Sequence, residues 1–103
     1  MPSTHDMARE LLAPERLGLE TRVEFRKAAV ELLETLPEGG GHLVINLKPT
    51  RHVDSAGLGV LMLIQRRAAE RRQRVVLRNA SDELRFLLVL TKLADLFELE
   101  SAA

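Results

Sequence analysis

The chain has 103 residues, the length of one compact domain, since single domains most often contain about 100–150 residues. Its 15 basic and 15 acidic residues cancel to a formal net charge of zero, which argues against a dedicated binder of nucleic acid or anionic membranes. The absence of cysteine excludes disulfides, thiolate catalysis, iron–sulfur clusters and cysteine-based zinc sites.

The N-terminus and the apolar runs predict a cytoplasmic protein without membrane insertion. No basic stretch followed by an apolar one opens the sequence, so we expect no signal peptide. The longest apolar runs, Leu58–Ile64 and Phe86–Leu90, are far shorter than the roughly 20 residues that a membrane span needs. The histidines His5, His42 and His52 lie in separate segments without the spacing of metal ligands.

The N-terminal segment predicts little regular structure. Residues 1–6 are polar, and we expect them to form a frayed tail. Met7–Leu12 is predicted as a short strand, and Pro14 limits regular pairing in the segment that follows it. A short strand region is therefore expected ahead of the first helix.

The first clear element is an amphipathic helix. Thr21 and Glu24 match a capping box, in which the hydroxyl and the carboxylate each satisfy a free backbone N–H. Apolar residues then repeat at three- and four-residue spacing from Phe25 to Leu36 and form one stripe. Pro37 and the glycines that follow it are expected to end the helix.

Strands and helices alternate in the rest of the chain. Short apolar runs predict strands at His42–Leu47, Arg74–Arg78 and Phe97–Leu99. Helical patterns lie between them, one over residues 58–69 and one from Ser81, where an N-cap and two acids open the helix. Such alternation requires crossover connections, so we predict a single α/β domain with a mixed, largely parallel sheet covered by helices.

The turn from Asp54 to Gly59 is the strongest candidate for a functional site. It precedes a helix at the carboxyl end of a strand, where ligands and partners usually meet such sheets. Ser55 is predicted as the N-cap, so that free N–H groups could receive a phosphate on its hydroxyl. Gly57 and Gly59 remove side chains from the first helical turn, which allows another protein to approach the backbone closely.

The same turn also has a purely structural interpretation, which the residues alone favour. Capping serines are common, and the glycines would permit tight packing of the helix on the sheet. A nucleotide-binding fingerprint fails, because Met62 stands where the third glycine is required and no Gly-Lys-Ser/Thr follows.

Other charged residues do not point to a second site. Five arginines fall within residues 66–74, and with zero net charge they are better explained as a solvated helix C-terminus than as a nucleic-acid patch: Arg66, Arg67, Arg71, Arg72 and Arg74. No Ser/His/Asp arrangement indicates a nucleophile, since Asp54 merely adjoins Ser55 and His52 is a weak base. We therefore predict that the protein is not an enzyme.

The segment Val53–Gly59 resembles the signature of bacterial STAS domains, specifically of the anti-sigma factor antagonists. In that signature a serine follows an aspartate shortly before Gly-Leu-Gly, as in this chain. The likeness covers most of the sequence and extends to Leu17–Phe25, His42–Leu47, Arg74–Asn79 with Ser81, and Leu90–Leu93 with Leu96 and Phe97.

The resemblance implies a small STAS-type domain without catalytic activity or cofactor. Unphosphorylated antagonists bind an anti-sigma factor, typically a serine kinase, and so release a sigma factor. The kinase phosphorylates the signature serine, here Ser55, which breaks the complex, and a PP2C-type phosphatase restores it. The partner-binding residues would be Asp54, Ser55, Ala56, Gly57, Leu58 and Gly59.

Two positions depart from the family pattern. Gly18 stands where the family usually has aspartate, and Lys92 replaces the glycine of a Thr-Gly-Leu motif. A non-switching STAS subunit remains the alternative, such as the accessory protein of a lipid-transport ABC system or a scaffold of a signalling assembly. Those relatives more often carry threonine at the serine position, so Ser55 favours the antagonist.

Overall fold

A computed structural model describes residues 7–100, in which strands and helices alternate. Along the chain they are β1 Ala8–Leu12, β2 Arg16–Leu17, α1 Arg22–Thr35, β3 His42–Asn46, β4 His52–Val53, α2 Ser55–Glu70, β5 Arg74–Arg78, α3 Asp82–Leu90, the 3₁₀ helix η2 Ala94–Leu96, and β6 Glu98–Leu99. The expected strands and helices are all present, with ends within a few residues of the predictions. The predicted tail, residues 1–6, lies outside the described residues.

The main sheet has four strands in the order β1-β3-β5-β6, and β2 pairs with β4 in a separate ribbon. All strand pairs within residues 7–100 are parallel, including Ala8 opposite His42 and His42 opposite Arg74. Parallel neighbours require crossovers, which α1 provides between β1 and β3 and α2 provides between β3 and β5. The predicted α/β fold is confirmed, and the expected mixed character of the sheet is not seen in this part of the chain.

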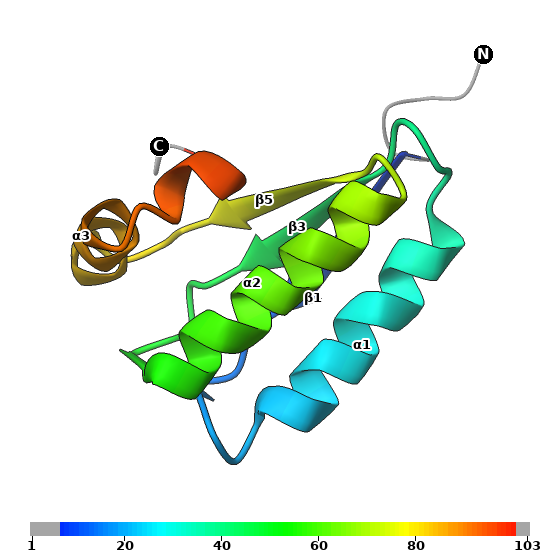
Figure 1. The fold of residues 1–103 in the computed structure, drawn as a ribbon. Coiled ribbons are helices and arrows are strands. Elements are labelled where there is room, and N and C mark those ends of the chain that lie inside the picture. Colours follow the sequence, from blue (N-terminus) through cyan, green and yellow to red (C-terminus); the bar gives the residue numbers. More distant parts are fainter. Residues whose placement is uncertain (1–6, 101–103) are drawn as a thin grey trace.

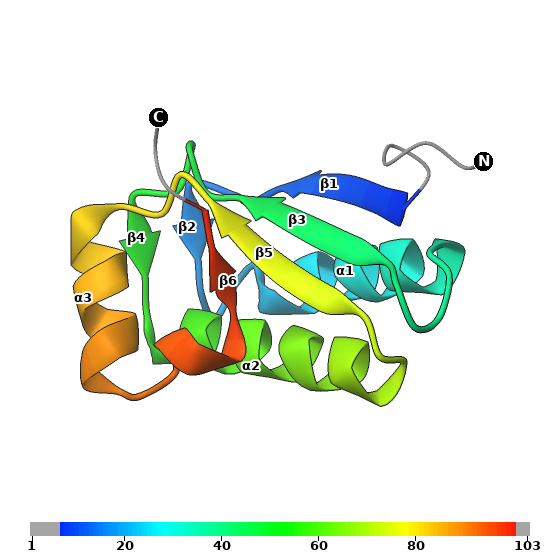
Figure 2. The same cartoon turned by 90° about the horizontal axis from the view of Figure 1, so that it is seen from above.

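Helices α1 and α2 lie side by side on one face of the main sheet, and α3 lies at its end (Figures 1 and 2). The core forms between this helix pair and the inward side chains of β3 and β5. Its largest fully buried side chains are Leu17, Leu33, Leu43, Ile45, Leu47, Leu61, Ile64, Leu77 and Leu88. The stripe predicted from three- and four-residue spacing supplies the α1 part of this core.

Charged side chains gather on the opposite face of the sheet. Arg78 on β5 is ion-paired with both Glu10 on β1 and Glu100, and its Nε lies 3.0 Å from the Glu100 carboxylate. Between these charges, Val44 and Val76 are only 8% exposed. The ion pairs therefore link the outer strands across an apolar centre that no helix covers within residues 7–100 (Figure 2).

One buried amide closes the end of α1. The side-chain Nε2 of Gln73, which is 6% exposed, donates to the backbone carbonyls of Leu33, Leu36 and Pro37 at 2.9, 3.0 and 3.3 Å. The last carbonyls of a helix have no partner inside it, so this side chain satisfies groups that burial would otherwise penalise.

The predicted capping box at the start of α1 is wrong. The Thr21 hydroxyl instead accepts from the Gly18 N–H at 3.1 Å and donates to the Arg16 carbonyl at 2.7 Å. A backbone turn, in which Gly18 O accepts from the N–H groups of Thr21 and Arg22, holds the chain here. The hydroxyl is therefore used to tie β2 to the start of α1.

The two-stranded ribbon was not expected from the sequence. Each of its strands, β2 and β4, has two residues, which is too short for an alternating pattern to show. Pairing of Arg16 with His52 and of Leu17 with Val53 brings these strands together across 36 residues of sequence.

One departure from the family pattern, Lys92, lies in the turn that ends α3. The Leu93 N–H bonds to the Leu88 carbonyl at 2.8 Å and the Lys92 N–H to the Val89 carbonyl at 3.1 Å, which is the Schellman arrangement. Lys92 has φ +61°, in the left-handed region where glycine is the usual residue. In this chain Lys92 therefore adopts a backbone conformation that is strained for any residue with a side chain.

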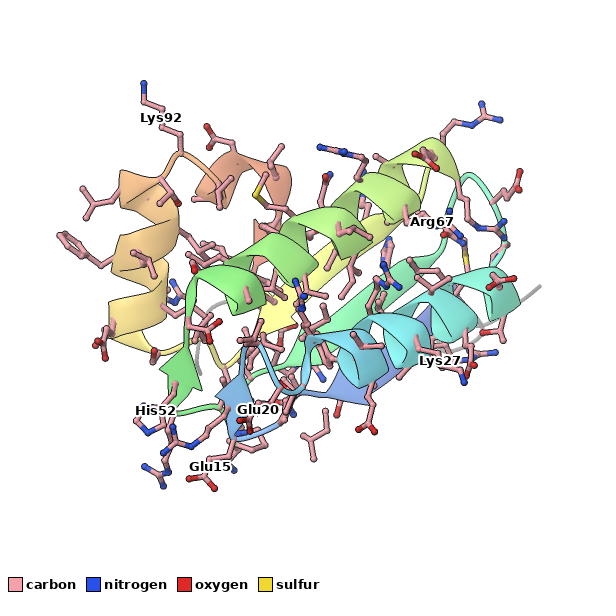
Figure 3. The ribbon with its side chains drawn as sticks, turned by 60° about the horizontal axis from the view of Figure 1, so that its bottom comes forward. Glu15, Glu20, Lys27, His52, Arg67 and Lys92 are labelled. Carbon is pink, nitrogen blue, oxygen red and sulfur yellow. The ribbon has the colours of Figure 1, made fainter. Side chains whose placement is uncertain are left out.

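Replacing Lys92 with glycine is expected to stabilise the protein. Lys92→Gly removes the left-handed strain, and we expect the free energy of unfolding to rise by about 0.5–1 kcal/mol in a denaturant titration. Lys92→Ala is the matched control, because it removes an exposed side chain (Figure 3) but keeps the strain. Equal stabilisation by both substitutions would contradict this account.

Candidate functional site

The predicted signature forms the end of β4 and the first turns of α2. Asp54, and not Ser55, is the N-cap, because its Oδ1 accepts from the Gly57 N–H at 2.9 Å. Ser55 is the first residue of the helix, which therefore begins one residue earlier than predicted. The prediction that Ser55 caps this helix is wrong. Aspartate and serine cap helices about equally well, and the structure uses the first of the two.

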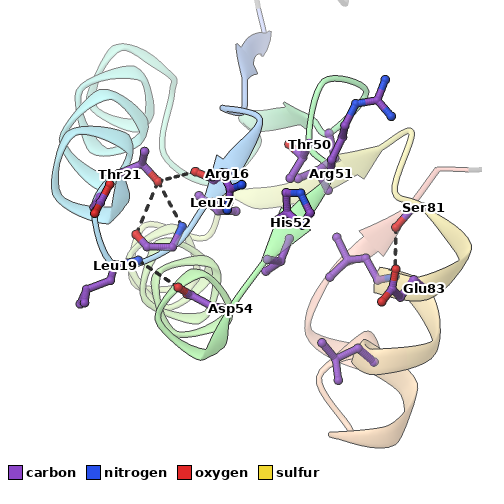
Figure 4. Close-up of a pocket in the computed structure, with 16 residues that line it drawn as sticks. Arg16, Leu17, Leu19, Thr21, Thr50, Arg51, His52, Asp54, Ser81 and Glu83 are labelled. Atoms are coloured by element: carbon purple, nitrogen blue, oxygen red, sulfur yellow. Dashed lines mark hydrogen bonds between the residues drawn. The ribbon is translucent and has the colours of Figure 1, made fainter.

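The second oxygen of the Asp54 carboxylate ties α2 to another segment. Its Oδ2 accepts from the Leu19 N–H at 3.2 Å, in the connection between β2 and α1 (Figure 4). The N–H groups of Gly57 and then Leu19, which donate to the charged carboxylate, lower the pKa of Asp54 below its ordinary value. The carboxylate therefore holds two chain segments together while it is ionised.

Gly18 provides the space that this carboxylate occupies. A Cβ atom on Gly18 would lie 2.3 Å from Oδ2 of Asp54, so a side chain here would force the carboxylate to shift. In this chain, Gly18 therefore leaves room for the Asp54 carboxylate.

The two glycines of the signature have different roles. A Cβ on Gly57 would lie 2.0 Å from the Leu17 carbonyl oxygen, whereas one on Gly59 would meet nothing within 4 Å. Gly57 therefore permits α2 to pack against β2, which is the structural interpretation. Gly59 alone leaves the helix backbone open to an approaching molecule.

Ser55 is exposed, and its hydroxyl makes no hydrogen bond with any of residues 7–100. It lies in a groove between the N-terminal halves of α1 and α2, lined by Arg22, Val23, Arg26, Ser55, Ala56, Gly59, Val60 and Leu63. Of the predicted partner-binding residues, this groove brings together Ser55, Ala56 and Gly59. Leu58 packs against the core, and Gly57 is buried.

The sequence does not predict that residues of α1 line this groove. Arg22 and Arg26 stand four residues apart on α1, a spacing that places both on one helix face. Nothing in the sequence indicates that this face lies opposite Ser55, because the packing of α1 against α2 decides it. Val23 and Leu63 add exposed apolar side chains, 60% and 40% accessible.

A second groove lies on the other side of the Asp54–Ser55 junction (Figure 4). The β2–β4 ribbon contributes Arg16 and His52 to it, and α3 contributes Ser81 and Glu83. Charges of both signs line this groove, so they do not single out a ligand. Within residues 7–100 no group of three or more His, Asp or Glu side chains is placed to hold a metal ion.

The fold and this site define a small parallel α/β domain that presents an exposed serine at the first turn of a helix. Residues 5–99 match the family described as "Mlab, STAS domain", so the chain belongs to the STAS domain family. No curated protein matches the chain. None of the helices within residues 7–100 has the length and hydropathy needed to cross a membrane.

Solved structures share this fold at low sequence identity. The unphosphorylated anti-sigma factor antagonist SpoIIAA is 14% identical and has a TM-score of 0.72, over 100% of this chain and 86% of that one. The putative anti-sigma factor antagonist TM1081 from Thermotoga maritima is 20% identical and has a TM-score of 0.77, over 94% and 81%. A sulfate transporter family protein from Wolinella succinogenes is 16% identical and has a TM-score of 0.60, over 85% and 67%.

Alanine at the two glycines is expected to have opposite effects on stability. Gly57→Ala drives a methyl group into the Leu17 backbone, and we expect a loss of about 1–3 kcal/mol in the free energy of unfolding. Gly59→Ala gains about 0.5–1 kcal/mol, since the site is open and alanine favours the helix. Both positions are helical, so each is the control for the other. Equal effects in denaturant titrations would contradict the assigned roles.

The Asp54 carboxylate also predicts a pH dependence. Its pKa is lower in the folded than in the unfolded protein, so its stabilisation is complete above the unfolded value of about 3.9 and is lost as the pH falls through the folded one. Asp54→Asn keeps a capping side chain without the charge. We expect the wild type to be the more stable at pH 7 and the difference in melting temperature to shrink below about pH 4. A difference that stays constant down to pH 2 would exclude this role.

Proposed function

We propose that this protein is an anti-sigma factor antagonist whose binding to its partner is controlled by phosphorylation of Ser55. The observation that carries the proposal is the free, exposed Ser55 hydroxyl beside the open backbone of Gly59. The structural likeness to SpoIIAA and TM1081 supports it at the level of the fold. The unphosphorylated form binds an anti-sigma factor that is also a serine kinase, and it has no catalytic activity or cofactor of its own.

The kinase acts on the Ser55 oxygen. Oγ attacks the γ-phosphorus of ATP, the bond from that phosphorus to the bridging oxygen breaks, and ADP leaves with the electron pair. The hydroxyl proton passes to a base on the kinase. Asp54 supports this step indirectly, because by capping α2 it leaves the serine hydroxyl unengaged.

The added phosphate breaks the complex through desolvation and charge. It brings about −1.5 to −2 charges to a surface that the kinase covers when Ser55 is unmodified. A buried charge without a partner costs roughly 2–5 kcal/mol, which corresponds to a loss of about 30-fold to several thousand-fold in affinity. A PP2C-type phosphatase hydrolyses the phosphate ester and restores binding. This cycle uses ATP and implies a cytoplasmic protein.

A non-switching STAS subunit is the second candidate. The likeness to a sulfate transporter family protein favours it, because it associates the same fold with a transport protein. In that case the exposed groove would bind a transporter component, for example the ATPase of a lipid-transport ABC system, and Ser55 would remain unmodified. A binding experiment with the purified, unphosphorylated chain distinguishes the two candidates: an antagonist binds a kinase, and a transporter subunit binds an ATPase.

Phosphorylation assays test the proposal directly. The anti-sigma serine kinases of the source organism are purified and each is incubated with the chain and ATP. We expect one of them to add a single phosphate, which mass spectrometry assigns to Ser55. Ser55→Ala should bind that kinase at least as tightly as the wild type, and Ser55→Asp about 30-fold or more weakly.

Ser81 offers the matched control for Ser55. It is also an exposed serine at a helix start, but its Oγ is engaged as the N-cap of α3 and accepts from the Leu84 N–H at 3.1 Å. Ser81→Ala should be phosphorylated like the wild type. Phosphate on Ser81, or equal affinities of the Ser55→Ala and Ser55→Asp proteins, would overturn the proposal.

A further inference from the structure

We infer that Arg22 and Arg26 of α1 form a phosphate-binding pair for the same chain and receive the phosphate of a modified Ser55. This inference rests on the proposed phosphorylation of Ser55. It concerns where the phosphate goes after the modification, which the proposed function leaves open.

The composition of the groove carries the inference. Its eight lining residues include two charged side chains, Arg22 and Arg26, and no described acidic residue lines it. Both arginines are exposed, and neither forms an ion pair with any acidic residue in the described part of the chain. Their guanidinium groups are thus available to an anion attached to Ser55 on the facing helix.

The charge of Arg22 already reaches the start of α2. The pKa of Asp54 is lowered chiefly by its bonds from Gly57 and Leu19, and the positive charge of Arg22 adds to that effect. Asp54 directly precedes Ser55, so a phosphate at position 55 would enter the same positive potential. Arg26 lies four residues further along α1 and lines the same groove.

The positive charge of the arginine pair is about equal to the negative charge of a phosphoserine. Two guanidinium groups carry two positive charges, and a phosphoserine carries about −1.5 to −2 at neutral pH. Arginine also binds phosphate through paired N–H donors, which makes it better suited than lysine to this role. Phosphorylation would therefore neutralise the groove and remove two cations from the partner-binding surface, in addition to placing a bulky group on it.

The inference can be tested without a kinase. Phosphoserine is placed at position 55 by genetic encoding, and the second pKa of the phosphate is measured by ³¹P NMR titration. We expect this pKa to lie below the roughly 6 of free phosphoserine by about 0.5–1, because two guanidinium groups line the same groove as Ser55. In the Arg22→Gln/Arg26→Gln protein it should rise by most of that amount.

The control pair is Arg66→Gln/Arg67→Gln, which removes the same net charge from the far end of α2 (Figure 3). It should leave the phosphate pKa at the wild-type value. All variants are exposed substitutions, and thermal melts of the unphosphorylated proteins confirm that they fold. A phosphate pKa equal in the wild type and the Arg22→Gln/Arg26→Gln protein would overturn the inference.

Failure of the inferred arginine pair and failure of the proposed function give different results. If the arginine pair shifts the phosphate pKa but no kinase modifies Ser55, the phosphate-binding pair exists and the antagonist proposal fails. If a kinase modifies Ser55 while the pKa does not depend on the arginines, the antagonist proposal stands and the inferred pair is wrong.

Discussion

The Asp54 carboxylate is the constraint on which the site depends. Its two oxygens bond to the N–H groups of Gly57 in α2 and Leu19 ahead of α1, so one side chain fixes how the two helices begin. Gly18, which has no side chain, leaves that space to the carboxylate. Both oxygens are engaged in these bonds, and the next residue, Ser55, is exposed and makes no hydrogen bond with any of residues 7–100.

Structural and recognition roles alternate along this short segment. Asp54 and Gly57 face the protein, where the first caps α2 and the second lets the helix approach the β2 backbone. Ser55 and Gly59 line the groove, where a Cβ on Gly59 would meet nothing within 4 Å. Because helical neighbours four residues apart share a face, one turn can carry both roles without conflict.

Sequence patterns predicted the elements that are long enough to show a period. The α1 stripe and the buried β3 and β5 runs were of this kind. The predicted cap of α2 is wrong, because Asp54 and Ser55 are both good capping residues and the sequence does not show which of them accepts the Gly57 N–H. Arg22 and Arg26 could not be placed, because their position opposite Ser55 comes from helix packing and not from local sequence.

A net charge of zero conceals an uneven distribution of charge. Several arginines are ion-paired on the surface, Arg71 with Glu38, Arg74 with Glu98, and Arg78 with two glutamates. In the groove beside Ser55, both charged residues among the described lining residues are cations, Arg22 and Arg26. Exposed charges are screened beyond about 8 Å at physiological salt, so a phosphate responds to this local excess and not to the balance of the whole chain. One covalent group is therefore enough to change the character of the surface, in a domain with no cysteine chemistry to offer another means of control.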